Sequence, residues 1–110
     1  MSGIITLRTV NNDLYQLQFK VRNGESIFLG EARATREQAR QDVDALRRAV
    51  LEDGRYAVYR DRRDRFQFTL LGDSGEPLGS SVPFLSPEDL GKAIAELKRG
   101  APQAVLEDLT

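Results

Sequence analysis

Arginines and tyrosines are interleaved in one short segment, residues 55–65, whose sequence is RYAVYRDRRDR. The segment holds five arginines and two tyrosines against two aspartates. Guanidinium groups bind phosphates and aromatic rings stack on bases, so this composition on a sheet is typical of a surface that binds single-stranded nucleic acid. The candidate binding residues are Arg55, Tyr59, Arg60, Arg62, Arg63 and Arg65.

A structural explanation of the same segment competes with this one. Residues 62–64 would form the solvated tip of a hairpin, and the tyrosines would be half-buried strand residues. The two aspartates dilute the positive charge, and the whole chain has 16 basic and 17 acidic residues, a net charge of −1. Because the chain has no overall attraction to nucleic acid or an anionic membrane, we favour the structural explanation.

Histidine and cysteine are both absent from the chain. Their absence removes disulfides, thiolate nucleophiles, the usual base that activates a serine, and the best transition-metal ligands. The sequence therefore predicts no catalytic residue, no metal site and no cofactor, and we expect a protein that is not an enzyme.

The remaining candidates for chemistry do not change this expectation. Glu25 and Glu76 follow two similar turns, where a pair of acids is conceivable but exposed turn residues are the simpler interpretation. The pair Ser80-Ser81 lacks the G-x-S-x-G pattern of an activated serine. The glycines form neither of the common phosphate-binding patterns, and the aspartates lack EF-hand spacing.

The length of 110 residues fits one domain, and a composition of 40% hydrophobic and 30% charged residues is ordinary for a globular protein. The N-terminal residues do not resemble a secretory signal, and no apolar run approaches the length of a membrane span. We therefore expect a small soluble protein in the cytoplasm, with no membrane partner.

The chain resembles itself at an offset of 51 positions, which places Phe66 on Tyr15 without a gap from residue 5 to residue 50. The identical pairs are Asp13/Asp64, Gln16/Gln67, Gly24/Gly75, Glu25/Glu76, Glu37/Glu88, Leu46/Leu97 and Arg48/Arg99. Such an offset is typical of an internal repeat, and the roles that coincide are better evidence than the identities.

Strands and turns coincide at this offset. Residues 15–21 and 66–70 alternate apolar and polar side chains, which is the period of a half-buried strand. Each strand ends in a turn with a glycine, Gly24 or Gly75, and we expect both glycines to have positive φ. A further strand should follow each turn, one through Ile27 and Leu29 and one over 78–84. Other strands are expected over 4–10, 55–60 and 103–108.

Two helices coincide as well. Thr35 with Gln38 predicts a capping box, and Ser86 followed by Pro87 predicts the start of the second helix. Gly100 should end that helix in a left-handed conformation. We also expect Arg40 and Asp44 to form an ion pair on the exposed face of the first helix. The predicted inward positions are Ala39, Val43, Leu46 and Val50, matched by Leu90, Ile94, Leu97 and Ala101.

The expected order is β-β-β-α-β-β-β-α-β, an α+β fold in which one β-β-β-α-β unit occurs twice. Repeat 1 covers about 1–54 and repeat 2 about 55–110, within a single domain of 1–110. We expect antiparallel sheets with two packing helices and a pseudo-two-fold axis, because two units together bury a core that one cannot build. The chain would then be a monomer with internal pseudo-symmetry. Whether the two repeats share one sheet is left open.

These features resemble the YegP-like proteins, also called the domain of unknown function 1508 family. Most of the likeness lies in the second copy, in the strand over 66–70, the Gly75-Glu76 turn, residues 94–102 and the final residues 107–110. The family usually has a tyrosine shortly before the helix, where Phe84 stands in the second copy and Arg33 in the first. The chain is thus identified as a tandem-repeat member with a divergent first copy, and the resemblance implies no activity.

Two functions follow from these observations. The first is a non-catalytic interaction or structural module, whose sheet edges would pair with a protein partner. The alternative is a weak single-stranded nucleic-acid binder that uses residues 55–65.

Overall fold

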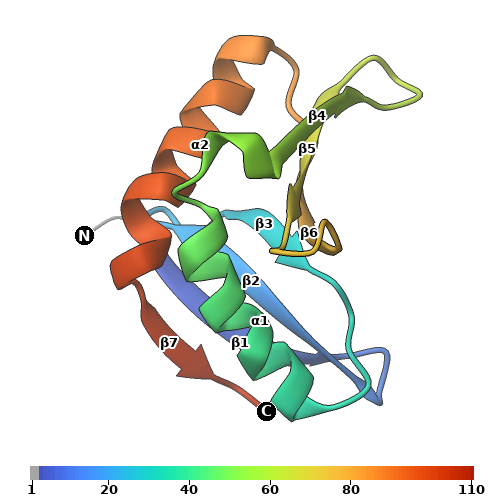
Figure 1. The fold of residues 1–110 in the computed structure, drawn as a ribbon, viewed down its shortest axis with the longest axis vertical. Coiled ribbons are helices and arrows are strands. Elements are labelled where there is room, and N and C mark those ends of the chain that lie inside the picture. Colours follow the sequence, from blue (N-terminus) through green and yellow to red (C-terminus); the bar gives the residue numbers. More distant parts are fainter. Residues whose placement is uncertain (1–2) are drawn as a thin grey trace.

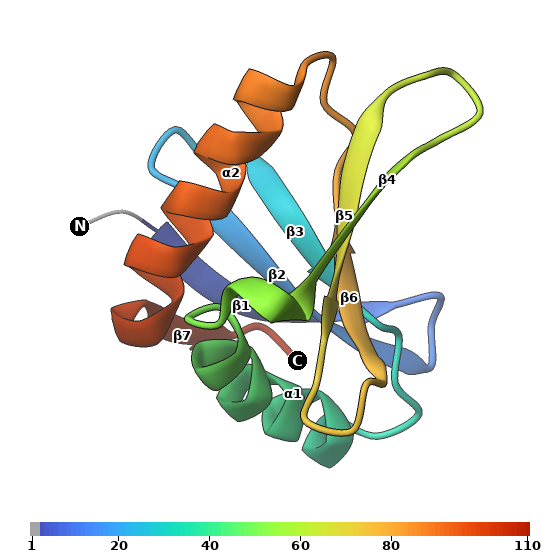
Figure 2. The same ribbon diagram turned by 45° about the horizontal axis from the view of Figure 1, so that its top comes forward.

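The computed structural model describes residues 3–110. Its strands are β1 (Gly3–Val10), β2 (Leu14–Val21), β3 (Ser26–Gly30), β4 (Tyr56–Arg60), β5 (Phe66–Leu71), β6 (Pro77–Ser81) and β7 (Val105–Asp108). Its helices are α1 (Arg36–Ala49) and α2 (Pro87–Gly100), with short 3-10 turns η1 (Asp53–Arg55) and η2 (Ala101–Gln103). All seven strands form one sheet, in the order β4-β5-β6-β3-β2-β1-β7, and both helices cover the same face (Figures 1 and 2). The mixed α+β class is confirmed.

The sheet is continuous, because β3 and β6 pair antiparallel between Phe28 and Ser81. The expectation of purely antiparallel sheets is wrong at one place. β7 pairs parallel with β1, from Ile4 opposite Val105 to Leu7 opposite Asp108. The reason is the connection: α2 carries the chain from β6 across the sheet to its far edge, and a parallel neighbour requires such a crossover.

One core lies between the sheet and the two helices. The largest fully buried side chains come from strands of both halves and from both helices. They are Phe19, Phe28, Phe68, Ile5, Leu7, Leu17, Leu46, Leu70, Leu97, Val50 and Thr6. The rings of Phe28 and Phe68 stack with centroids 6.0 Å apart, so the two halves of the chain meet at this point.

The turns after β2 and β5 are built in the same way. Gly24 has φ of +92° and Gly75 has φ of +82°, as the sequence predicted. Positive φ is strained for a residue with a Cβ, which explains glycine at both turns. Beyond the second turn, the strand expected over 78–84 is shorter, and Phe84 pairs with Phe66 only as an isolated bridge.

The helix starts agree with the sequence predictions and the second helix end does not. Thr35 and Gln38 form the capping box, and the Ser86 hydroxyl accepts the N–H of Asp89. Gly100 has φ of −90°, because α2 runs directly into η2 and no left-handed residue is needed there.

The predicted inward helix positions are buried with one exception. Ile94 is only half-buried, while its neighbour Ala93 is buried in its place. Leu90 and Leu97, one turn away on either side, are buried beside Ala93. The apolar face of α2 is therefore the predicted one with Ala93 added, and Ile94 packs against the core at its margin.

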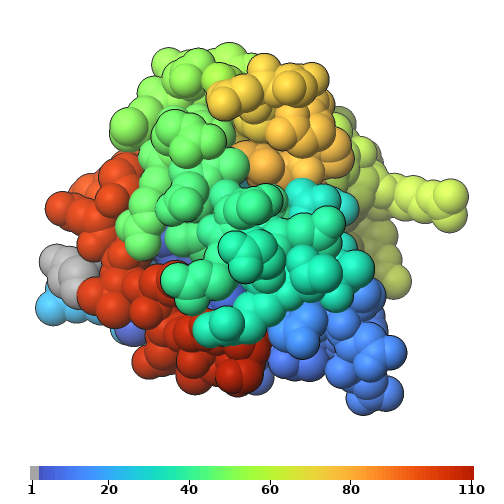
Figure 3. Space-filling model, turned by 60° about the horizontal axis from the view of Figure 1, so that its bottom comes forward, coloured from blue at the N-terminus to red at the C-terminus, as the bar shows by residue number. Residues whose placement is uncertain are grey.

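The expected pair between Arg40 and Asp44 is not formed. Arg40 instead lies 3.3 Å from Asp108 of β7, and Arg36 binds the same carboxylate. Figure 3 shows α1 and β7 side by side on this face. A carboxylate on β7 therefore ties the last strand to the first helix.

Asp108 gives a prediction about acid stability. Hydrogen bonds from Thr110 and then from Arg36 hold the pKa of Asp108 well below its usual value. A depressed pKa in the folded state contributes stability above the unfolded pKa, about 3.9, and this contribution is lost as the pH falls through the folded pKa. We expect Asp108→Asn to be less stable than wild type at pH 7 and the difference to shrink below about pH 4. Urea unfolding over a pH series measures it, and a difference independent of pH would contradict it.

Candidate functional site

The residues predicted from segment 55–65 lie on the β4–β5 hairpin. The turn of this hairpin projects from the body of the molecule (Figures 1 and 3). Asp61 closes it, because its N–H donates to the carbonyl of Arg65 at 2.9 Å and its carboxylate accepts the N–H groups of Arg63 and Arg65. Asp64 has φ of +60° at the tip. Residues 62–64 therefore lie in a hairpin turn, as the structural explanation expected.

Two of the predicted arginines are held by carboxylates. Arg65 lies 3.1 Å from Asp61, whose pKa is lowered by the backbone N–H of Arg65 and then by that of Arg63, so the carboxylate stays ionised. Arg55 lies 2.9 Å from Asp73 and 3.2 Å from Glu52. These two arginines brace the hairpin, and their charges are already compensated.

Tyr59 and Arg60 point to opposite faces of the sheet. Arg60 lies opposite Phe66 in the register and its guanidinium stands 4.8 Å from the Phe66 ring centroid, on the face that the helices cover. Tyr59 lies opposite Gln67 and projects from the other face. The interleaved arginines and tyrosines thus do not meet on one face, because neighbouring strand residues alternate between faces.

The structure brings Arg60, Arg62 and Arg63 to the same end of the hairpin. Within residues 3–110, Arg62 and Arg63 have no side-chain ion pair or hydrogen bond, and Arg60 is 4.0 Å from Asp64. The described residues include no cluster of acidic side chains suited to a metal ion. None of the helices in this part of the chain is both long and apolar enough to span a bilayer.

The strand β4 forms one edge of the sheet among the described residues. At its start the N–H of Tyr56 donates to the carbonyl of Asp53, and no strand pairs with the outward groups that follow. Asp61 bonds to Arg65, and hydrogen-bonded pairs alternate along an antiparallel ladder. Ala57 and Tyr59 therefore bond to β5, whereas Val58 and its alternate neighbours direct N–H and C=O groups outward. Val58 is 56% exposed, and Tyr59 is 40% exposed. Such an edge is a ready template for another strand.

At the opposite end of the sheet, an additional strand is already present, because β7 pairs with the outer side of β1. β4 lies 51 positions after the middle of β1, and the outer edge of β1 is covered by β7 in parallel. The outer edge of β4 has no such neighbour within residues 3–110. This edge was not predicted from the sequence. The signal for it was that residues 56–60, YAVYR, lack the apolar and polar alternation of the buried strands.

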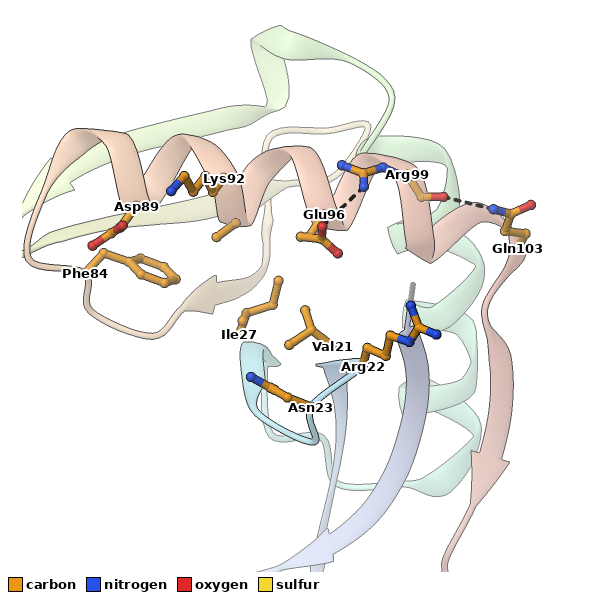
Figure 4. A pocket seen from close by; sticks show the side chains of 11 residues that line it. Val21, Arg22, Asn23, Ile27, Phe84, Asp89, Lys92, Glu96, Arg99 and Gln103 are labelled. Carbon is orange, nitrogen blue, oxygen red and sulfur yellow. Dashed lines mark hydrogen bonds and ion pairs between the residues drawn. The ribbon is translucent and has the colours of Figure 1, made fainter. Parts of the chain in front are cut away.

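A second feature, also missed by sequence reasoning, is a groove of about 630 Å³ between α2 and the β2–β3 hairpin (Figure 4). Its apolar lining is Val21, Ile27, Phe84 and Ala93, and its polar lining is Arg22, Asn23, Asp89, Lys92, Glu96, Arg99 and Gln103. No sequence signal pointed to it, because its two walls are about 70 residues apart in the chain.

No family model matches the chain. A UPF0339 protein of Pseudomonas aeruginosa is 23% identical over 98% of both chains, and the UPF0339 protein YegP of Escherichia coli is 22% identical over the full length of both. The tryptophan–tRNA ligase of Bordetella parapertussis is 32% identical over 82 residues, which are 74% of this chain and 17% of that protein.

Two solved structures have the same fold. The solution structure of YegP from Escherichia coli, a protein of unknown function, gives a TM-score of 0.93 with 22% identity and covers 100% of this chain and 95% of that one. A UPF0339 protein of Shewanella oneidensis gives a TM-score of 0.94 with 24% identity, over 100% and 93%. UPF0339 proteins, YegP among them, are thus similar to this chain over its full length and have the same fold, which supports the predicted resemblance to the YegP-like family.

Proposed function

We propose that this protein is a non-catalytic interaction module, built as a tandem duplication, that binds one extended strand of a protein partner at the outer edge of β4. The observation that carries the proposal is the open edge of β4, a strand whose counterpart β1 is covered by β7. The chain would act as a monomer in the cytoplasm, with repeat 1 at about 1–54 and repeat 2 at about 55–110.

Hydrogen bonds that recur at residues 51 positions apart support the duplication. The bond from Tyr15 N to Arg33 O recurs from Phe66 N to Phe84 O, and the bond from Val21 N to Glu25 O recurs from Gly72 N to Glu76 O. The side-chain bond from Gln16 Nε2 to Gly30 O likewise recurs from Gln67 Nε2 to Ser81 O. A pseudo-two-fold axis would then pass between β3 and β6, the antiparallel pair at the centre of the sheet. Such an axis would relate β1 to β4.

The duplication would explain why one edge is open. The chain leaves α2 and enters β7, which covers β1. The chain that leaves α1 enters β4 itself, so it cannot also cover β4. A symmetric sheet of this kind would have eight strands, and the proposed partner strand takes the eighth position.

The chemistry of the partner strand follows from the residues around this position. A strand parallel to β4 would end beside Arg60, Arg62 and Arg63, which favours acidic residues near its C-terminal end. β7 has this pattern, because it ends in Glu107 and Asp108, and Asp108 lies beside Arg36 and Arg40 of α1. The proposed partner segment is therefore extended, apolar at its start and acidic at its end.

A peptide with the sequence of residues 104–110, AVLEDLT, blocked at both ends, tests the proposal. We expect saturable binding that shifts amide signals of β4, and at least tenfold weaker binding to Val58→Pro, which lacks the outward N–H. Val58→Thr keeps the N–H and should bind as the wild type does. A peptide with both acids replaced by lysine should bind more weakly. Equal binding to Val58→Pro and Val58→Thr would contradict the proposal.

Single-stranded nucleic-acid binding is the second candidate. It is favoured by the free guanidinium groups of Arg62 and Arg63 and by the resemblance to a segment of a tryptophan–tRNA ligase. It predicts binding to a single-stranded RNA that weakens steeply with salt and is lost when Arg62, Arg63 and Arg65 are replaced with alanine. Unchanged affinity of that triple variant would eliminate the site.

A further inference from the structure

We propose that the groove between α2 and the β2–β3 hairpin is a binding site for a small organic carboxylate with an apolar body, whose carboxylate lies between Arg22 and Arg99. The groove volume of about 630 Å³ lies within the range of small-molecule sites. The proposal concerns a different surface from β4 and does not depend on the proposed function.

The argument begins at the equivalent place in the other half of the molecule. There the β5–β6 hairpin carries Asp73, which lies 4.0 Å from Arg48 of α1 and 2.9 Å from Arg55. This carboxylate fastens the hairpin to the helix side of the molecule. Opposite charges on the two walls therefore hold this contact together.

The groove lies at the position that the offset of 51 residues relates to this contact, and it carries different charges. The residues 51 positions away from Asp73 and Arg48 are Arg22 and Arg99, and both line the groove. Two cations on facing walls do not attract each other, so the hairpin is not fastened to α2. An anion placed between them would restore the arrangement of charges around Asp73.

Figure 4 shows the arginines in relation to the apolar surface. Arg22 reaches along the groove from the hairpin, and Arg99 projects from α2, where it lies 3.3 Å from Glu96. Within residues 3–110, the Arg22 guanidinium has no ion pair or hydrogen bond. Val21 and Ile27 lie next to Arg22, and Phe84 lies at the other end of the groove near Asp89. These three side chains supply the apolar surface that a hydrocarbon or aromatic body would cover.

The remaining charges of the lining leave a cationic excess. Arg22, Lys92 and Arg99 face two carboxylates, Asp89 and Glu96. Glu96 competes with an incoming carboxylate for Arg99, since the two side chains are already paired. Removing the Glu96 charge should therefore strengthen binding, while reversing the Arg22 charge should abolish it.

The test is a titration of isotopically labelled protein followed by amide chemical shifts, with 4-phenylbutyrate as the probe. We expect saturable shifts at amides around Arg22, Ile27 and Ala93. Two control probes, 4-phenylbutanol without the charge and acetate without the apolar body, should each bind at least tenfold more weakly.

Variants complete the test. Arg22→Asp gives the hairpin the charge of Asp73 and should weaken phenylbutyrate binding at least tenfold, whereas Glu96→Gln should strengthen it at least twofold. Arg8→Ala removes an exposed arginine of β1 that does not line the groove, and this variant should bind as the wild type does. Saturable shifts confined to other surfaces, or binding by Arg22→Asp within twofold of wild type, would overturn the proposal.

Discussion

Replacing Phe68 with alanine is expected to lower the free energy of unfolding by about 3–5 kcal/mol, the usual cost of removing a fully buried aromatic ring. Phe68 has no exposed surface, and its ring contacts Phe28 from the other half of the sheet and Tyr56 at a centroid distance of 5.2 Å. The cavity would open where the two halves meet, so the whole chain should lose stability in one cooperative transition.

Phe84→Ala is the matched control for this measurement. The Phe84 ring is half-buried at the groove and its bond to Phe66 is made by the backbone, which alanine keeps. We expect less than half of the loss at Phe68, because less apolar surface is exposed to water. Denaturant unfolding measures both variants. Equal losses, or two separate transitions for Phe68→Ala, would contradict a core that both halves share.

Two neighbouring prolines on β4 are expected to have very different effects on stability. Val58 directs its N–H to the open edge, so proline there removes no ladder bond, and edge strands tolerate proline in this orientation. Tyr59 directs its N–H to β5, and proline there leaves an unpaired carbonyl at a cost of about 1–3 kcal/mol.

Each proline is compared with alanine at the same position, so that the loss of the side chain cancels. The difference between Tyr59→Pro and Tyr59→Ala should exceed the difference between Val58→Pro and Val58→Ala by at least about 1 kcal/mol. Denaturant unfolding of the four variants measures these two differences in the free energy of unfolding. The reverse order would show that the ladder of β4 has the opposite phase, and the outward groups would then be those of Ala57 and Tyr59.

Local features of the fold could be predicted from the sequence because each depends on neighbouring residues. The capping box of Thr35 and Gln38 and the positive φ of Gly24 and Gly75 are of this kind. Gly100 was mispredicted for the same reason: the glycine and the following proline suggest a stop, but the chain continues into η2. The propensity of a single residue did not decide the path of the chain there.

The parts that the sequence did not predict depend on distant partners. Arg40 has an acid at the favourable spacing on its own helix, yet it lies beside Asp108, 68 residues away. The parallel position of β7 also follows from the path of α2 across the sheet and not from the pattern of residues 103–108. Long-range ion pairs and edge positions therefore required the structure.

The candidate site was predicted only in part, because the pattern of charges in a sequence does not show which face each side chain takes. Segment 55–65 was identified correctly as a charged hairpin. The structure then separates Tyr59 from Arg60 and pairs Arg55 and Arg65 with carboxylates. The open edge of β4 and the groove beside Arg22 lay outside the prediction, because both are defined by where neighbouring strands end.

Amide hydrogen exchange measured with and without the AVLEDLT peptide reports on individual N–H groups of β4, and it therefore shows which of them the peptide binds. We expect the peptide to slow exchange at Val58 and Arg60, whose N–H groups face outward. Exchange at Ala57 and Tyr59 should stay unchanged, since their N–H groups are already bonded to β5. Uniform protection along β4, or protection only at the edge of β1 or β7, would contradict the claim that the outer edge of β4 is a vacant position for a strand.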